Sequence, residues 1–407
     1  INASVSNAIG NTGSSNHTIT VDLSAPAMGI NIDSLQADTG LSASDFITSV
    51  SPVVVNGSLT AALASNETAQ ISIDGGTTWT TLTVTGTTWR YNDSRTLTDG
   101  NYLYQVRVID AAGNVGATDS QNVVIDTTAP DPAVKTIAIS AITTDMGLIT
   151  NDFVTSDTTL AVSGTLGATL SAGEFAQISL DGGVTWIDLT VTGTTWRYAD
   201  GRTLTDGTYQ YQVRVIDNAG NVGATDSQDV VVDLTAPAAT TITVDAVTQD
   251  TGLSDSDFIT SDNQITLNGT LGAALGRGEH AQISIDGGTT WIDVNVSGLT
   301  WTYVDGRTLA DGDYNYQLRV IDDAGNISAT TSQVVTIDTV APDASKTVSI
   351  DSISDDTGLS NSDFVTNDTS LTLHGSLGAT LADGEGVQIS LDGGSPWQNV
   401  ALVGKPW

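Results

Sequence analysis

The feature that most constrains the fold of this chain is an internal repeat of about 105 residues. The tripeptide Asp-Gly-Gly begins at Asp74, Asp181, Asp286 and Asp392, with spacings of 107, 105 and 106 residues. Ala-Pro pairs and a second motif, Asp-Thr-Gly or Asp-Met-Gly, recur with nearly the same period. Self-similarity at a fixed period indicates an array of similar structural units rather than one large fold.

The motif positions predict three complete units flanked by two partial ones. Because Val5–Gly13 aligns with Val108–Gly116, residues 1–22 are expected to be the last strands of a preceding unit. The complete units are predicted at 23–126, 127–233 and 234–338, and a partial unit at 339–407. The chain is therefore expected to be a fragment of a longer array, whose fourth unit lacks its last strands.

Each unit has the pattern of short strands joined by tight turns. In "YLYQVRVID", Tyr102, Tyr104, Val106 and Val108 alternate with polar residues such as Arg107, so the apolar side chains share one face of a strand. About seven such strands per unit, with frequent turns, predict an immunoglobulin-like β-sandwich. The predicted fold class is all-β, with tandem sandwich modules in an extended rod.

The charge of the chain excludes several classes of partner. The formal net charge is −35, which opposes binding to nucleic acid or to an anionic membrane surface. No apolar run is long enough for membrane insertion, and with no cysteine the chain has no disulfides. Of the 47 acidic residues, 43 are Asp and 4 are Glu. Asp favours turns and binds hard cations such as calcium, so calcium is the expected stabiliser and cofactor.

One recurring loop carries two Asp residues seven positions apart. In "DTGLSASDFIT" these are Asp38 and Asp45, on either side of a Gly, with Ser and Thr hydroxyls between them. Such a set of oxygen atoms fits calcium, and it also fits an Asx-turn that starts a strand. The counterparts in the other units are Asp145 and Asp152, Asp250 and Asp257, and Asp356 and Asp363.

A second group of acidic residues is predicted to meet where consecutive units join. The last strand of a sandwich runs the length of the unit, so Asp110 and Asn114 are expected at one end and Asp126 at the other. Asp126 should then lie close to the loop Asp217–Asn221 of the next unit, and calcium would relieve the repulsion. Acidic turns that merely keep the array soluble are the alternative. The corresponding sets are Asp22 with Asp110 and Asn114, and Asp233 with Asp322 and Asn326, while Asp338 holds the same linker position.

Three further motifs are interpreted as structural. "SIDGGTTW", Ser72–Trp79, matches the Asp box of sialidases, which is a turn and not a catalytic site, and no histidine recurs to serve as a base. The Tyr after Asp-Gly, as in Tyr102, predicts a tyrosine corner or core packing. The outward-facing arginines, of which Arg107 is the first, are expected to pair with neighbouring acids on the sheet surface. No catalytic site is predicted, and the chain is expected not to be an enzyme.

With these motifs the chain resembles the tandem bacterial immunoglobulin-like repeats of giant secreted adhesins, of the RTX and biofilm-associated type. The resemblance rests on "DTGLSxSDFIT", "SIDGGTTW", "LTDGxYxYQVRVIDxAGN" and "DTTAP", and it covers the chain from Asp22 onward. It implies type I secretion to the bacterial cell surface, and it implies calcium ligands at Asp38, Asp45, Asp110, Asn114, Asp126 and their counterparts. Two departures are Asn7 in place of the loop Asp, and Ser140 where other units have Asp.

The function expected from this resemblance is a non-enzymatic, calcium-rigidified extender that projects a distal adhesive domain for cell adhesion or biofilm formation. The expected partners are calcium ions and the neighbouring modules of the same chain. The alternative is that the modules themselves bind a host glycan or protein. Calcium at 100 times its dissociation constant adds about 2.7 kcal/mol per site, so its removal should lower the melting temperature, and magnesium should substitute poorly.

Overall fold

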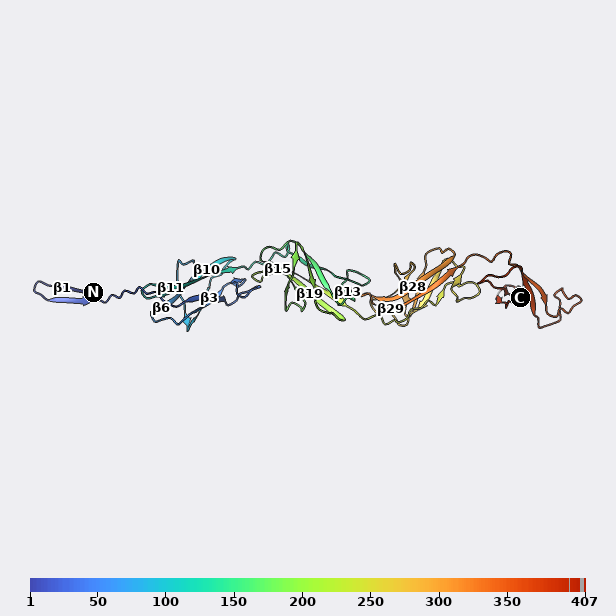
Figure 1. The fold of residues 1–407 in the computed structure, drawn as a ribbon, viewed down its shortest axis with the longest axis horizontal. Coiled ribbons are helices and arrows are strands. Elements are labelled where there is room, and N and C mark those ends of the chain that lie inside the picture. Colours follow the sequence, from blue (N-terminus) through green and yellow to red (C-terminus); the bar gives the residue numbers. More distant parts are fainter. Residues whose placement is uncertain (395, 403–405) are drawn as a thin grey trace. The chain divides into compact units, whose positions relative to one another are not determined.

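A computed structural model describes residues 1–394, 396–402 and 406–407, and every regular element in them is a β-strand (Figure 1). No helix in this described part of the chain is long and apolar enough to cross a membrane. The described chain forms two compact units, Ile1–Asp145 with Asp157–Val232, and Met146–Ser156 with Asp233–Trp407. The all-β prediction is confirmed.

Nine strands make up the first module, here defined as β3 to β11. They are β3 (Ile30–Leu35), β4 (Ile47–Thr48), β5 (Val54–Leu59), β6 (Glu67–Ser72), β7 (Thr80–Thr81), β8 (Val84–Thr85), β9 (Thr88–Asn92), β10 (Gly100–Asp110) and β11 (Val115–Ile125). A four-stranded sheet has the order β3-β5-β9-β8, and a five-stranded sheet has the order β4-β11-β10-β6-β7. Two packed sheets of this kind form the predicted immunoglobulin-like sandwich.

The second and third modules repeat this arrangement. The second module comprises β12 (Ile137–Ile142), β13 (Val154–Thr155), β14 (Ala161–Leu166), β15 (Glu174–Ser179), β16 (Ile187–Asp188), β17 (Val191–Thr192), β18 (Thr195–Ala199), β19 (Gly207–Asp217) and β20 (Val222–Val232). The third module comprises β21 (Ala246–Val247), β22 (Ile259–Thr260), β23 (Thr266–Thr270), β24 (Glu279–Ser284), β25 (Ile292–Asp293), β26 (Asn295–Ser297), β27 (Thr300–Val304), β28 (Gly312–Asp322) and β29 (Ile327–Ile337).

The ends of the chain hold shorter sheets. At one end β1 (Asn2–Ser6) and β2 (Thr12–Asn16) form an antiparallel hairpin whose residues are all exposed. At the other end are β30 (Val348–Ile353), β31 (Leu373–Leu377), β32 (Gln388–Ile389) and β33 (Gln398–Asn399). The unit predicted at 339–407 includes residues 395 and 403–405, which lie outside the described part of the chain. The predicted unit boundaries stay a prediction.

The core lies between the two sheets of each module. In β10 the side chains of Tyr104, Val106 and Val108 are fully buried, while Gln105 and Arg107 face outward, as the alternation predicts. The antiparallel pair β10–β11 continues this pattern, and Val123 and Ile125 of β11 are buried beside them. Burial of each such side chain contributes about 1.5–3 kcal/mol to the free energy of unfolding.

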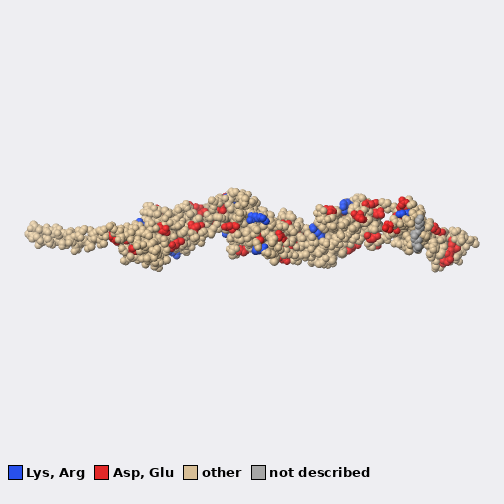
Figure 2. Space-filling model, in the orientation of Figure 1, with Lys and Arg blue, Asp and Glu red and all other residues tan. Residues whose placement is uncertain are grey.

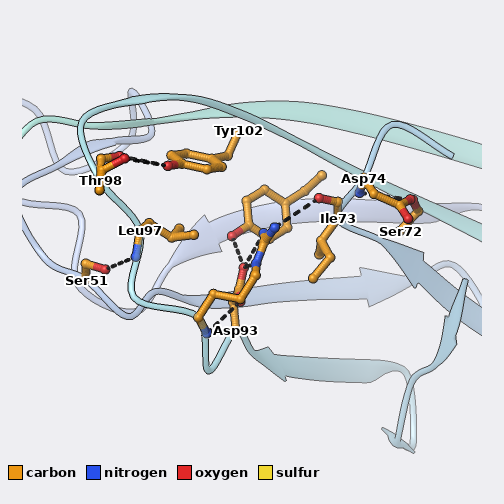
Figure 3. Close-up of polar contacts among 10 residues, drawn as sticks. Ser51, Ser72, Ile73, Asp74, Asp93, Leu97, Thr98 and Tyr102 are labelled. Carbon is orange, nitrogen blue, oxygen red and sulfur yellow. Dashed lines mark hydrogen bonds and ion pairs between the residues drawn. The ribbon is translucent and has the colours of Figure 1, made fainter. Parts of the chain in front are cut away.

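Both turn motifs adopt the predicted local structures. Asp74 accepts hydrogen bonds from the backbone N–H of Thr78 (2.8 Å) and from the Ser72 hydroxyl (2.7 Å). Bonds from the side chain and backbone of Thr78 lower the pKa of Asp74 to about 2. The Tyr102 hydroxyl donates to the carbonyl of Thr98 (2.8 Å), which is a tyrosine corner (Figure 3).

A buried carboxylate joins the two sheets of each module. Asp93 follows β9 in one sheet, is only 1% exposed, and accepts hydrogen bonds from Arg95 and from the hydroxyl of Tyr104 in β10 of the other sheet (2.6 Å each; Figure 3). Burial opposes ionisation, but the bonds from Arg95 and Tyr104 outweigh it and lower the pKa of Asp93. The same triads are Asp200, Arg202 and Tyr211, and Asp305, Arg307 and Tyr316.

Each of the strands β10, β19 and β28 carries two tyrosines, one that binds the buried carboxylate and one that forms the tyrosine corner, so the contributions of the two hydrogen bonds to stability can be measured separately. Replacing Tyr104, Tyr211 and Tyr316 by Phe is expected to cost about 1.5–3 kcal/mol per module, because each loses a buried bond to a charged group. Replacing Tyr102, Tyr209 and Tyr314 by Phe removes exposed bonds to carbonyls and is expected to cost about 0.5–1.5 kcal/mol per module. Denaturant unfolding measures both triple variants, and equal losses would show that the triad does not join the sheets.

Candidate functional site

The loop between β3 and β4 holds both acidic residues of the Asp-Thr-Gly motif. Asp38 Oδ2 accepts a hydrogen bond from the backbone N–H of Phe46 (3.1 Å), and Asp45 Oδ1 accepts one from that of Ile47 (3.1 Å). Phe46 has a φ of 61°, a left-handed conformation that a bulky side chain rarely adopts. Local strain of this kind persists where the surroundings enforce it, often at ligand-binding loops.

The second oxygen of Asp38 has no protein partner. Asp38 Oδ1 is buried and accepts no hydrogen bond, and Asp250 Oδ1 and Asp356 Oδ1 share this property at the equivalent positions. A buried, unpaired carboxylate oxygen is costly unless a cation or donor compensates it. Burial, and secondarily the charge of Asp45, raises the pKa of Asp38. An orphaned oxygen at one position of the repeat fits the predicted cation ligand.

The other copies of the loop have the same local structure. Asp250 and Asp356 accept from the backbone N–H groups of Phe258 and Phe364 (3.0 Å each), and both phenylalanines have a φ of 60°. In the second module Phe153 has a φ of 64°, and Asp145 opens the loop. Each second acid of the motif accepts a backbone N–H two residues ahead, as seen for Asp152, Asp257 and Asp363. The Asx-turn and the cation site are therefore compatible.

The second group of predicted residues forms a tight turn after the long strand β10, β19 or β28. In the first module Asp110 Oδ1 accepts from the backbone N–H of Asn114 (2.9 Å), and Asp110 Oδ2 accepts from the Asn114 side-chain amide (2.9 Å). The bond from the Asn114 side chain is the main cause that lowers the pKa of Asp110. Asp217 with Asn221 and Asp322 with Asn326 repeat the bonds, and all three Asp residues are buried.

The structure brings this turn together with the linker that precedes its module. The Asn221 amide that binds Asp217 also donates to the backbone carbonyl of Asp126 (2.8 Å). The equivalent bonds join Asn114 to the carbonyl of Asp22 (3.0 Å) and Asn326 to that of Asp233 (2.8 Å). The predicted proximity is thus found, but the direct link is an amide-to-carbonyl hydrogen bond. A metal-ligand role for these residues stays a prediction.

The linker is also bound to the module that it leaves. Asp99 Oδ1 accepts from the backbone N–H of Thr127 (2.8 Å) and from its hydroxyl (2.7 Å), and Asp311 binds Thr339 in the same way. Burial, then the charges of Asp217 and Asp99, raises the pKa of Asp126. Sequence reasoning assigned no role to Asp99, although the recurring "LTDG" or "LADG" contains it.

The Asp-Thr-Gly loop of one module docks on the Asn-containing turn of the next. Within the first compact unit, the Thr39 hydroxyl donates to the Ala219 carbonyl (2.6 Å) and the Leu41 N–H donates to the Asn218 carbonyl (3.4 Å). Within the second, the Leu148 N–H donates to the Asp323 carbonyl (3.1 Å). The sequence did not predict this contact. Its only signal was that Gly follows the Asp-Thr or Asp-Met pair in every copy.

The carboxylates do not by themselves complete a metal shell. Within residues 1–394, 396–402 and 406–407, no three His, Cys, Asp or Glu side chains are grouped so that they could hold a metal ion. Each loop offers two carboxylates, of which Asp38 and Asp45 are the example, with the hydroxyls and carbonyls between them. A hard cation that takes six to eight oxygens would draw the remainder from carbonyls, hydroxyls and water.

The outward arginines do not pair with acids, so that expectation is wrong. The guanidinium of Arg107 lies 3.9 Å from the ring centroid of Trp79, and its Nε donates to Gln70 Oε1 (2.9 Å). Arg214 on Trp186 (4.0 Å) and Arg319 on Trp291 (4.1 Å) repeat the stack. A planar guanidinium stacks well on an indole, and the Asp-box hairpin places the Trp above the strand that carries the Arg. Acidic side chains are spread over the surface that Figure 2 shows.

The comparison with protein families decides the identity of the modules. The model of the bacterial Ig-like domain matches residues 25–127, 132–234 and 236–339. The chain belongs to the bacterial Ig-like domain family. It therefore carries three tandem bacterial Ig-like domains, which agrees with the coarser part of the resemblance given above.

Both a curated protein and several solved structures are similar to this chain. Exoglucanase B of Cellulomonas fimi is 28% identical over 311 residues, which are 75% of this chain and 26% of that protein. The chain thus spans about a quarter of the length of that relative. Solved structures that resemble it include the chicken CNTN1 FN1-FN3 domains (14% identity, 77% of this chain and 100% of that chain, TM-score 0.29). Another is the BSP domain of a biofilm-associated protein (11% identity, 76% and 68%, TM-score 0.18).

Gly40 and Gly252 hold equivalent positions in two copies of the loop, so replacing each of them tests the docking of the loop on the next module. A Cβ at Gly40 would lie 1.9 Å from the Asn218 carbonyl oxygen, whereas one at Gly252 meets nothing within 4 Å. Both residues have positive φ (101° and 116°), so Ala strains the backbone at both sites. Gly40→Ala is expected to lose more stability in thermal unfolding than Gly252→Ala and to expose the amide of Leu41 to hydrogen exchange. Equal losses, with Leu41 still protected, would contradict the docking.

Proposed function

We propose that this chain is a calcium-rigidified extender segment of a bacterial surface adhesin, with no catalytic role of its own. The observation that carries the proposal is the buried, unpartnered carboxylate oxygen of Asp38, which recurs at Asp250 and Asp356. Ordinary turn acids satisfy both oxygens with hydrogen bonds or water. A bound cation would account for a carboxylate oxygen that has neither a hydrogen-bond donor nor contact with water in several copies of the repeat.

The position of the loop relates cation binding to stiffness. Asp38 lies one residue before Thr39, whose hydroxyl binds the Ala219 carbonyl of the next module. A cation held by Asp38 and Asp45 would neutralise their mutual repulsion and fix the loop that makes this contact. Calcium, when bound, supplies positive charge and a flexible oxygen shell. The chain's own residues, Thr39 and Gly40, then transmit the order of the loop to the neighbouring module.

The Asn-containing turns give the junction a second attachment, which forms without a metal. Asn221 binds the linker carbonyl at Asp126, and Asp99 binds Thr127 after it. The linker "DTTAP" also contains no Gly and ends in Pro, which restricts its backbone. We infer that these bonds set the path of the linker and that the cation at the Asp38 loop limits the bending that remains.

Membership of the bacterial Ig-like family supports the adhesive setting at a coarse level. The chain has three such domains in tandem, and their motifs recur with little change from one unit to the next. Repeats whose units differ little suit a spacing role, since a catalytic site would make one unit different from the others. Secretion to the cell surface through a type I system, millimolar calcium outside the cell and a distal adhesive domain are parts of this proposal.

Calorimetric titration of the chain with calcium tests the proposal. Calcium is expected to bind and to raise the melting temperature, with about 2.7 kcal/mol per site at 100 times the dissociation constant. Magnesium should do so weakly, because it prefers a small octahedral shell. The triple variant Asp38→Asn, Asp250→Asn and Asp356→Asn keeps an oxygen for the backbone N–H of each Phe. It is expected to lose most of the calcium response and to keep only that of the Asp145 loop, while remaining as stable as the unmodified chain in chelator.

A control variant removes three charges elsewhere. Asp229, Asp313 and Asp383 are exposed, and their replacement by Asn is expected to leave calcium binding unchanged. The proposal is contradicted if the unmodified chain shows no calcium binding. It is also contradicted if the two triple variants bind calcium equally well.

A further inference from the structure

The outer face of the five-stranded sheet in the second module carries a groove of about 440 Å³. Six of the residues that line it are Trp186, Gln212, Arg214, Val222, Asp226 and Ser227. They come from the Asp-box hairpin and from the adjacent strands β19 and β20. A pocket of this size with an aromatic ring and a few polar groups is typical of small-ligand sites.

Arg214 retains donor capacity in this groove. Its Nε donates to Gln177 Oε1 (2.9 Å), and its guanidinium lies over the Trp186 ring. None of the ion pairs found among the described residues involves Arg214. Burial lowers the pKa of Arg214, which nevertheless stays charged because the ordinary pKa of Arg is so high.

The polar groups of the groove are mixed in character. Gln212 and Ser227 offer both donors and acceptors, and Arg214 offers donors only. Asp226 brings a negative charge into the lining, although its Oδ2 already accepts from the backbone N–H of Ile139 (2.8 Å). Asp188 accepts from the same Gln177 that binds Arg214. These carboxylates and the net charge disfavour an anionic ligand.

We propose that this groove binds a pyranose unit of a neutral polysaccharide. The planar side chains of Gln212 and Asp226 and the guanidinium of Arg214 can hydrogen-bond neighbouring hydroxyls of the sugar. The apolar C–H groups of the ring pack on Trp186 and on Val222, which is 43% exposed. Amphipathic ligands of this kind need an apolar surface bordered by polar groups. No metal ion takes part, so the site operates independently of the calcium loops.

The same residues recur in the neighbouring modules. The first module has Trp79, Gln105, Arg107, Val115, Asp119 and Ser120 at the equivalent positions, and the third has Trp291, Gln317, Arg319, Ile327, Thr331 and Ser332. Thr331 replaces the acid in the third module, and a hydroxyl still bonds to sugars. Three weak sites on one chain raise the overall affinity for a polysaccharide that can occupy more than one.

The alternative is that the Trp–Arg stack only holds the hairpin against the sheet. Trp186 Nε1 already donates to the Gly183 carbonyl (3.0 Å), which supports such a role. The test therefore changes the edge of the groove and leaves the stack intact. Gln105, Gln212 and Gln317 are replaced by Ala, since the side-chain bond of Gln212 is an exposed one to Gln210. The matched control replaces Gln121, Gln228 and Gln333 by Ala, which removes one amide per module from outside this groove.

Affinity electrophoresis of the whole chain measures binding in gels that contain one of the neutral polymers hydroxyethyl cellulose, xyloglucan and galactomannan, or the anionic polygalacturonate, with chelator present. At least one of these neutral polymers is expected to retard the unmodified chain and the control. The groove variant is expected to bind about tenfold more weakly, with an unchanged melting temperature. A second variant, Trp79→Ala, Trp186→Ala and Trp291→Ala, should abolish the retardation.

Three results would overturn the proposal. The first is no retardation by any of the neutral polymers. The second is retardation that the groove variant and the control share equally. The third is retardation by polygalacturonate alone, which would mean that the guanidinium selects an anion instead of a neutral sugar.

Discussion

The amide of Asn221 is the contact on which the arrangement of consecutive modules depends. It donates to the buried carboxylate of Asp217 in its own turn and to the Asp126 carbonyl in the linker before its module. One side chain therefore fixes a turn and attaches it to the preceding segment of the chain. Since a buried carboxylate without its donor is costly, the turn and the linker are stabilised together. Asn114 and Asn326 repeat the arrangement.

The abundance of Asp over Glu follows from the positions that these residues occupy. Asp74, Asp93 and Asp110 each accept a hydrogen bond from a backbone N–H two to four residues further along the chain, and each also binds a side chain that is equally near in the sequence. A Glu carboxylate is one methylene further from the backbone and does not reach these donors in the same turn. The Asp38 loop differs, because one oxygen accepts the Phe46 N–H and the other has no donor. That difference separates turn acids from the acids that we assign to a cation.

The sequence predicted the sandwich well because the strand signal is local. The alternation in Tyr102–Asp110 requires one buried face, and the structure buries Tyr104, Val106 and Val108. The repeat also predicted that Asp126 would meet the turn that holds Asn221, since the last strand runs between the two ends of a module. The bounds of short strands such as β7 and β8 could not be predicted, because a strand of two residues is too short to show alternation of apolar and polar residues.

Contacts that depend on a choice between partners could not be predicted from the sequence. Arg107 faces outward among many acids, yet it stacks on Trp79, because the Asp-box turn folds that ring over β10. The docking of Thr39 on Ala219 depends on the angle between two modules, which no local pattern encodes. Asp99 was overlooked for the same reason: its partners Thr127 and Thr128 lie 28 and 29 residues further along the chain.

The central claim is that a cation at the Asp38 loop stiffens an array whose linker path is already set by Asn and Asp side chains. Small-angle X-ray scattering of the chain, first in millimolar calcium and then with excess chelator, tests it most directly. The account predicts a long maximum dimension with calcium and a shorter, more flexible ensemble after chelation. An unchanged maximum dimension and an unchanged scattering profile would show that the acidic loops do not stiffen the array.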